Sequence, residues 1–265
     1  MFVDSHAHID GTEFDADRDQ VIQRARDAGV RAILNVGTGD PHDGNLERAV
    51  ELAERNDDIY AAIGTHPHDA RLFNEAAEAR ILSLFKSSRR LLAWGEIGLD
   101  YHYDNSPREV QRAAFRRQLQ LAREVKLPVI IHTREAEDDT IAILRDEWAN
   151  SGLGGIMHCF SGSLDLAKAT MELGFLISFA GVVTFKKTDD LRAVAAEVPL
   201  ERLLIETDCP YLSPVPFRGR RNEPAHVVEV ARGLAAIHDK SVEEIGTITA
   251  ANFGRLFDID LGSAG

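Results

Sequence analysis

The chain begins with Met1-Phe2-Val3-Asp4-Ser5-His6-Ala7-His8-Ile9-Asp10, in which a short apolar run leads into two histidines two residues apart. Side chains of a strand alternate between its two faces, so a strand here would point His6 and His8 in the same direction. Two imidazoles on one face of a strand end can bind a divalent metal together. By itself, the pattern also fits two ordinary surface histidines.

Short apolar runs of this kind recur eight times, and longer amphipathic stretches separate them. Their brevity and the turn residues around them indicate strands, and the stretches with helical periodicity indicate helices. The predicted strands are Phe2–Asp4, Ala32–Val36, Tyr60–Ile63, Leu91–Trp94, Pro128–Ile131, Gly155–Met157, Phe175–Ser178 and Leu203–Ile205. The clearest predicted helices are Asp17–Ala28, Gly44–Arg55, Arg108–Val125, Asp165–Leu173 and Ser241–Phe257.

Two of these helices have recognisable starts in the sequence. Ser106 followed by Pro107 predicts a capping hydroxyl and then a proline at the first helical position, where its missing N–H costs nothing. Ser241 and Glu244 have the spacing of a capping box, which predicts the start of the last helix.

Strands that alternate with helices predict a parallel sheet, and eight such units are the number that closes a (β/α)8 TIM-type barrel. The length of 265 residues fits a single barrel domain spanning 1–265. An open, doubly wound sheet is the alternative. No glycine-rich dinucleotide or P-loop fingerprint follows the first strand, which weakens that alternative.

The composition is that of a soluble globular protein, with 44% hydrophobic and 28% charged residues. No apolar run approaches the roughly 18–20 residues of a membrane span, and the N-terminus lacks the pattern of a signal peptide. Two cysteines do not make a disulfide framework. We therefore expect a cytoplasmic protein with no membrane contact and no obligate protein partner. A net charge of −13 restricts any nucleic-acid contact to a local basic surface.

Further metal-binding residue types lie in or just after the predicted strands. A barrel brings the C-terminal ends of its strands to one rim, so residues far apart in sequence become neighbours there. These residues are His66 and His68 after the third strand, Glu96 after the fourth, His132 after the fifth, His158 after the sixth and Asp208 after the eighth.

Four imidazoles and two carboxylates at one rim would be costly to bury without a cation. We expect two divalent ions, one held by His6, His8 and Asp208. The other would be held by His132 and His158, with Glu96 able to bridge the two. Imidazoles suit zinc or manganese, whereas carboxylates and a phosphate substrate also admit magnesium. Such a site activates water to hydrolyse phosphodiesters, amides or lactones.

Other residues are predicted to support the ligands or contact substrate. Asp4, Asp100 and Glu206 are candidates to orient the ligands. His66 is the candidate extra catalytic group, because an imidazole titrates in the neutral range, and His68 could contact substrate. The densest basic cluster lies after the eighth strand, where arginine forks could pair with phosphate oxygens. Its members are Arg218, Arg220 and Arg221, and Arg134 after the fifth strand is a further candidate.

The assembled motifs resemble the TatD-type metal-dependent deoxyribonucleases within the amidohydrolase-like barrels. The resemblance spans nearly the whole chain, from DSHAHID at 4–10 to TAANFGRLF at 249–257. Between them lie GTHPH (64–68), GEIGLDY (95–101), IIHTREA (130–136), MHCFSG (157–162), ISFAGVVTFK (177–186), ETDCPYL (206–212) and PVPFRGRRNEP (214–224).

The resemblance implies a deoxyribonuclease, and similar enzymes trim single-stranded DNA from the 3′ end. It implies that the metal ligands are His6, His8, Glu96, His132, His158 and Asp208. Glu96 and Asp208 would serve catalysis together with His66, which similar enzymes carry outside the metal shell. Many related amidohydrolases bridge their metals with a carbamylated lysine, and Glu96 in that place favours the nuclease-like branch.

Other functions fit the same residues. A small-molecule amidohydrolase or lactonase would use this metal site in a closed pocket and would not need the basic loop. A deacylase of aminoacyl-tRNA would use both the metal site and the basic rim. A catalytically idle metal-binding scaffold is a third alternative, which the complete set of ligands disfavours.

Overall fold

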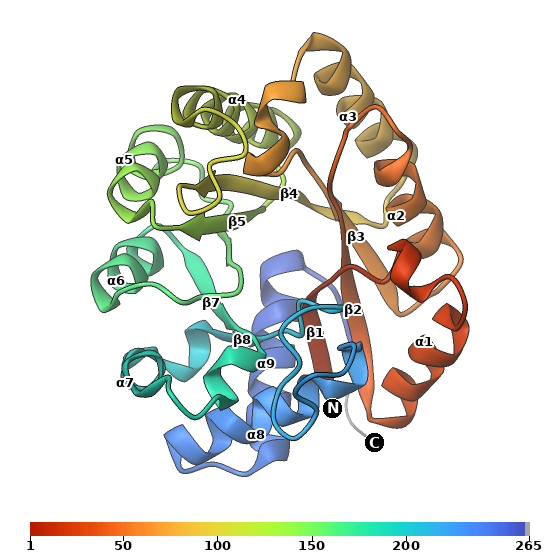
Figure 1. The fold of residues 1–265 in the computed structure, drawn as a ribbon, viewed down its shortest axis with the longest axis vertical. Coiled ribbons are helices and arrows are strands. Elements are labelled where there is room, and N and C mark those ends of the chain that lie inside the picture. Colours follow the sequence, from red (N-terminus) through yellow and green to blue (C-terminus); the bar gives the residue numbers. More distant parts are fainter. Residues whose placement is uncertain (263–265) are drawn as a thin grey trace. The chain divides into compact units, whose positions relative to one another are not determined.

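A computed structural model describes residues 1–262 of the chain. Strands and helices alternate along it, and the strands follow one another in chain order in a parallel sheet (Figure 1). This is the TIM-type (β/α)8 fold, so the predicted fold class is confirmed. The strands are β1 Phe2–Ala7, β2 Val30–Gly37, β3 Ile59–Ile63, β4 Leu91–Asp100, β5 Val129–Arg134, β6 Gly155–Met157, β7 Phe175–Phe179 and β8 Leu203–Ile205.

The helices that the sequence predicted are present, with ends that differ by one or two residues at most. These are α1 Arg18–Asp27, α2 Asn45–Glu54, α4 Arg108–Val125, α6 Leu164–Glu172 and α9 Val242–Phe257. The structure adds α3 Glu75–Ser87, α5 Glu137–Glu147, α7 Asp189–Glu197 and α8 Val227–His238. Short 3-10 helices are η1 Thr12–Phe14, η2 Pro67–Leu72, η3 Gly181–Thr184, η4 Leu200–Arg202 and η5 Pro224–His226. Among the described residues, no helix has the length and apolar character to cross a membrane.

The chain divides into two compact units. The first unit comprises 1–35, 159–167 and 176 onward, and the second comprises 36–158 and 168–175. The single domain expected over 1–265 stays a prediction, and its last three residues lie outside the described ones.

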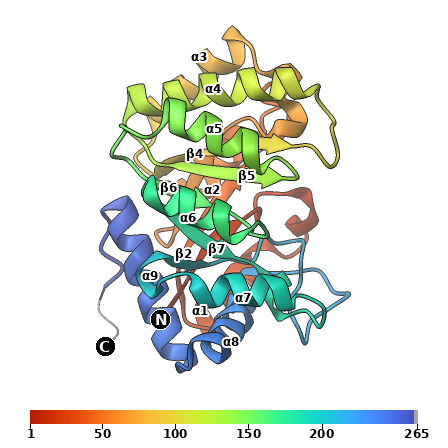
Figure 2. The same ribbon diagram turned by 90° about the vertical axis from the view of Figure 1, so that its left-hand side faces the viewer.

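In the second unit, β4 and β5 lie under the helices α4 and α5 (Figure 2). The apolar face of α4 covers β4, and Trp94 of that strand is fully buried and stacks on Phe85 with ring centroids 5.0 Å apart. Two glutamines of the same face, Gln111 and Gln118, are also buried. They are seven residues apart, which places both on the side of the helix that faces the strand.

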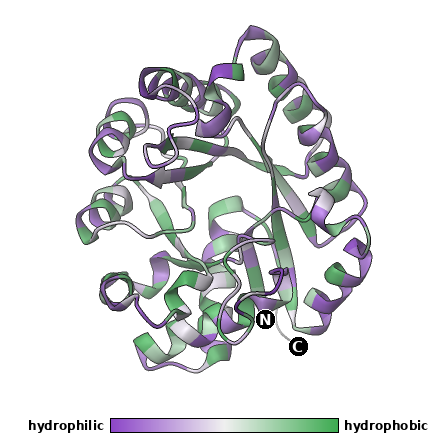
Figure 3. Ribbon diagram, viewed as in Figure 1, coloured by the Kyte–Doolittle hydropathy of each residue, from purple (hydrophilic) through white to green (hydrophobic). Residues whose placement is uncertain are grey.

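In the first unit, α9 packs against β1, β8 and α8. Ser241 begins this helix with the predicted capping box: its hydroxyl accepts from the Glu244 N–H, and the Glu244 carboxylate accepts from the Ser241 N–H. Helix α1 of this unit alternates hydrophilic and hydrophobic residues, as an amphipathic surface helix does (Figure 3). Its buried residues include Val21 and Ile22.

The predicted start of α4 is wrong. Pro107 is the N-cap rather than the first helical residue, and no side chain caps this end. The Ser106 hydroxyl instead donates to the His68 carbonyl and accepts from the Arg71 N–H. These bonds tie the loop before α4 to η2, which explains why the hydroxyl does not reach the helix.

Candidate functional site

The first unit holds a cluster of three metal-binding side chains. The Nε2 atoms of His6 and His8 lie 3.2 Å apart, so the two rings point to one place as strand alternation predicts. Oδ1 of Asp208 lies 3.4 Å from Nε2 of His8 and 3.9 Å from that of His6. One donor atom from each residue lies within 4.8 Å of the others, which suits a shared ion.

Backbone contacts of the segment after β8 hold Asp208 in this cluster. Its N–H donates to the His6 carbonyl, and the His8 N–H donates to the Cys209 carbonyl, which extends β1 pairing past the strand end. Asp208 has a φ of 53°, in the left-handed region that few non-glycine residues adopt. Such conformations collect at functional sites, where the surrounding structure compensates their cost.

Two further carboxylates lie behind this cluster and are fully buried. Asp4 accepts from the N–H and the hydroxyl of Thr207, and Glu206 accepts from the Cys159 N–H. Burial, together with the nearby Glu206 charge, raises the pKa of Asp4 to about 8. The two hydrogen bonds from Thr207 to Asp4 connect β1 to the segment that carries Asp208. A residue that orients the ligands would make contacts of this kind. That role stays a prediction for both carboxylates.

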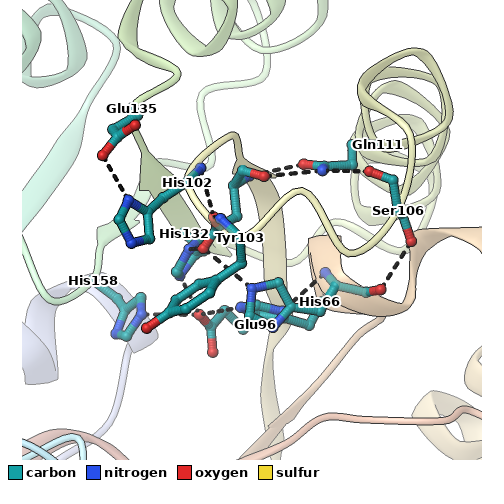
Figure 4. Close-up of polar contacts among 11 residues, drawn as sticks. His66, Glu96, His102, Tyr103, Ser106, Gln111, His132, Glu135 and His158 are labelled. Atoms are coloured by element: carbon teal, nitrogen blue, oxygen red, sulfur yellow. Dashed lines mark hydrogen bonds and ion pairs between the residues drawn. The ribbon is translucent and has the colours of Figure 1, made fainter.

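The second unit holds a cluster built around one carboxylate (Figure 4). Oε1 of Glu96 lies 2.9 Å from Nδ1 of His132 and 2.9 Å from Nε2 of His158. Nε2 of His66 approaches the same oxygen to 3.3 Å. Glu96 is only 3% exposed, so this contact takes place away from solvent. The sequence predicted that His66 acts outside the metal shell, and its catalytic role stays a prediction.

Gly98, two residues after Glu96, lets this strand approach His132 closely. The fourth strand was predicted to end at Trp94, but β4 continues to Asp100, so Glu96 lies within the strand. Gly98 pairs with His132 across the sheet at a φ of 143°, and a Cβ there would come within 1.9 Å of the His132 carbonyl oxygen. Only glycine permits this approach.

Asp100, at the end of β4, links this cluster to the following loop. Its Oδ2 lies 3.0 Å from Nε2 of His132 and 3.2 Å from Nε2 of His68. Its Oδ1 accepts from the backbone N–H groups of His102 and Tyr103. When an imidazole binds a metal through one nitrogen, a carboxylate that accepts a hydrogen bond from the other nitrogen fixes the ring orientation and raises the basicity of the ligand. This geometry is the one expected if Asp100 orients His132, and it leaves Nδ1 of that ring for the ion.

The pKa directions follow from burial and from these contacts. Burial alone would raise the pKa of Glu96, but the imidazoles of His158 and His66 hold it well below its ordinary range. Burial opposes, but does not outweigh, the hydrogen bonds that His132 donates to the carboxylates of Asp100 and Glu96, and these bonds raise the pKa of His132. Burial lowers the pKa of His66 to about 4, so this ring is neutral at pH 7.

The donor set fits a divalent cation. A carboxylate oxygen offers about two lone pairs, yet three imidazole nitrogens converge on one oxygen of Glu96. A cation among them would accept the lone pairs of the nitrogens and of the carboxylate together. Neutral imidazoles and ionised carboxylates are also the forms that bind metals.

The basic loop after β8 belongs to the first unit, and its three arginines differ in their surroundings. Arg221 pairs with Asp17 at 2.7 Å and donates to the Glu13 carbonyl. Arg218 lies over the ring of Phe185, 3.7 Å from its centroid. Arg220 is exposed, and in the described part of the chain no hydrogen bond or ion pair holds its guanidinium. Of the three, Arg220 has its donors most available for a phosphate.

Three residues that support the second unit's cluster were not predicted from the sequence. Gln111 exchanges hydrogen bonds with the backbone of Asp100, and Gln118 does the same with Thr65, next to His66. The signal was available, because two glutamines seven residues apart on an apolar helix face need buried polar partners. Tyr103, which contacts His68, was missed because it lies in a loop without a repeating pattern.

The chain is similar to known proteins over nearly its whole length. The family model described as TatD related DNase matches residues 3–258. The uncharacterized metal-dependent hydrolase YabD of Bacillus subtilis is 46% identical over 98% of this chain and 100% of its own length. The 3′-5′ ssDNA/RNA exonuclease TatD of Cronobacter sakazakii is 36% identical over 94% of this chain and 95% of its own.

A solved structure shows the same fold. The crystal structure of YJJV, a TatD homolog from Escherichia coli K12, superimposes with a TM-score of 0.90 at 32% identity. The match covers 98% of each chain.

Proposed function

The chain belongs to the TatD-related DNase family of metal-dependent hydrolases, and we propose that it is a nuclease that removes nucleotides from the 3′ end of single-stranded DNA. The observation that carries this proposal is the pair of ligand clusters, one in each unit, made of imidazoles and carboxylates. Relatives named as 3′-5′ exonucleases support the choice of substrate and polarity.

Each cluster is proposed to hold one divalent ion. His6, His8 and Asp208 would hold the ion of the first unit, and Glu96, His132 and His158 that of the second. The ions would supply Lewis-acid activation of water and neutralise negative charge on the phosphoryl oxygens. The bridging role expected for Glu96 and the choice among magnesium, manganese and zinc stay predictions.

The side chains around the ligands then have separate tasks. Asp100 holds His132 in the orientation that presents Nδ1 to the ion. His66 is neutral at pH 7, and its Nδ1 accepts from the His68 N–H, so Nε2 carries the proton and can donate to a phosphate oxygen. Within the basic loop, Arg220 is the arginine whose guanidinium can pair with the phosphate backbone. The cytoplasmic location expected from the sequence stays a prediction.

A cleavage time course tests the proposal. Protein stripped of metal is incubated with 3′- or 5′-labelled single-stranded DNA, with and without manganese or magnesium. We expect a ladder that depends on added metal and that shortens the strand from its 3′ end. The variant Glu96→Gln should give no ladder, whereas Glu197→Ala, which removes an exposed carboxylate of α7, should cleave like the wild type.

Absence of any ladder with any metal would overturn the nuclease proposal. Hydrolysis of an amide, a lactone or an aminoacyl ester by the same preparation would then assign the metal site to one of the other hydrolase classes. A ladder that Glu96→Gln retains would instead show that the second unit's cluster does not perform the cleavage.

A further inference from the structure

Tyr103 is an exposed aromatic side chain beside the second unit's ligand cluster. It is 55% exposed, whereas most large apolar side chains of the described residues are buried. Its ring meets the edge of His68 with centroids 5.4 Å apart, and it meets His102 at 4.8 Å. A flat apolar ligand that covers an exposed aromatic ring removes apolar surface from water, which lowers the free energy.

Arg134 lies against the same ring. Its guanidinium carbon lies 5.0 Å from the ring centroid of Tyr103. Within residues 1–262, no hydrogen bond or ion pair holds this guanidinium, so its donors face solvent. An aromatic face beside a guanidinium with available donors offers a nucleotide both a stacking surface and a phosphate partner.

Hydrogen bonds fix the position of this pair relative to the metal ligands. The Tyr103 N–H donates to Oδ1 of Asp100 at 2.8 Å, and Oδ2 of the same carboxylate contacts His132. A hydrogen bond between Nδ1 of His102 and Oε1 of Glu135, at 2.7 Å, ties the loop to the residue after Arg134. The loop that presents Tyr103 is therefore anchored on the carboxylate that orients a proposed ligand (Figure 4).

We propose that Tyr103 and Arg134 form a nucleotide-binding subsite, in which Tyr103 stacks on an unpaired base and Arg134 pairs with an adjacent phosphate. The inference rests on the proposed function and gives a physical reason why the proposed nuclease would prefer single-stranded DNA to a duplex. A base within a duplex is already stacked and paired, so it can reach the ring of Tyr103 only after leaving the helix. Stacking accepts every base, so the subsite selects unpaired strands without reading sequence.

Binding measurements test the subsite without requiring cleavage. Metal-loaded protein is titrated into a fluorescent single-stranded oligonucleotide with phosphorothioate linkages at its 3′ end, and anisotropy gives Kd. Tyr103→Leu should raise Kd about 10-fold, because it removes the stacking surface and keeps an apolar side chain. Tyr103→Phe should bind like the wild type. The matched control is Tyr60→Leu, since Tyr60 also lies under an arginine but at the start of β3.

A series of oligonucleotides, each with one base removed, tests the contact directly. In the wild type, one position of the series should raise Kd about as much as Tyr103→Leu does. In Tyr103→Leu, the same missing base should have no further effect. Equal Kd values for Tyr103→Leu and the wild type, or additive losses from the variant and the missing base, would overturn the subsite.

The outcomes separate this inference from the proposed function. Cleavage of single-stranded DNA together with binding that ignores Tyr103 would overturn the subsite and leave the nuclease standing. Binding that depends on Tyr103 without cleavage under any metal would support the subsite and overturn the nuclease. A wild-type protein that does not bind the oligonucleotide would overturn both. Thermal unfolding of each variant shows that it is folded.

Discussion

The ligand clusters of the two units use the same kinds of donor but are assembled differently. In the first unit, His6 and His8 come from one strand and its end, and Asp208 joins them through backbone hydrogen bonds. In the second unit, three imidazoles from three separate elements converge on one oxygen of the buried Glu96. Two of the three residues of the first cluster form a local motif, whereas the fold brings together every residue of the second.

This difference predicts which substitutions each cluster tolerates. Asp208 is partly exposed, so water can replace some of its contacts with the imidazoles. Glu96 is only 3% exposed, and its loss leaves the buried His158 and the partly buried His66 and His132 without the carboxylate that they share. Loss of the Glu96 carboxylate should therefore affect both the ion and the surrounding structure, whereas loss of the Asp208 carboxylate should affect mainly the ion.

The largest expected effect is that of Glu96→Gln. We expect kcat to fall to the level of metal-stripped protein, because the amide keeps the shape of the carboxylate and loses its charge. Asp208→Asn should also lose activity but should recover part of it at high metal concentration. Steady-state kinetics across a metal titration measures both. Equal recovery of the two variants by added metal would remove the distinction between the clusters.

Asp100→Asn should have the next largest effect. It removes the charge that orients His132 but keeps the side chain's shape and its hydrogen bonds to the loop backbone. Loss of such a supporting carboxylate typically costs about 10–100-fold in metal affinity or activity. The dependence of kcat on metal concentration should shift by that factor, with little change in thermal stability. A variant with the wild-type metal dependence would show that Asp100 does not position His132.

Sequence patterns were sufficient for the first cluster and insufficient for part of the second. Strand alternation placed His6 and His8 on one face, and the order of strands identified Glu96, His132 and His158 as residues at strand ends. The lengths of β4 and β5 were underestimated, because polar residues at a strand end resemble a loop. Ser106 was mistaken for a cap, since its bonds to η2 are tertiary contacts that no local pattern records.

A smaller effect separates the arginines of the basic loop. Arg220→Ala should weaken DNA binding and lower the slope of log K against log salt by about 1, as loss of one phosphate contact does. Arg221→Ala should change that slope less, because its guanidinium is engaged by Asp17. Arg89→Ala provides the control, since it removes an exposed arginine before β4. Identical slopes for Arg220→Ala and Arg89→Ala would exclude Arg220 from the phosphate contact.

The smallest expected effect is that of Asp17→Asn on stability. The hydrogen bond from Arg221 outweighs partial burial and, with Arg24, holds the pKa of Asp17 below its ordinary value of 3.8. A depressed folded-state pKa gives stability that is present above the unfolded value and is lost as pH falls through the folded one. Asp17→Asn should cost at most about 1 kcal/mol at neutral pH, and that difference should shrink below about pH 4. Urea unfolding at several pH values measures it, and a constant difference would contradict the ion pair.

The most direct test of two ion-binding clusters is a count of bound ions. Apoprotein is equilibrated with manganese, freed of excess metal, and measured by elemental mass spectrometry as wild type, His8→Ala and His132→Ala. We predict two ions per wild-type chain and a loss of one in each variant, because each removes a ligand from a different cluster. A wild-type chain that binds a single ion at saturation would contradict the account.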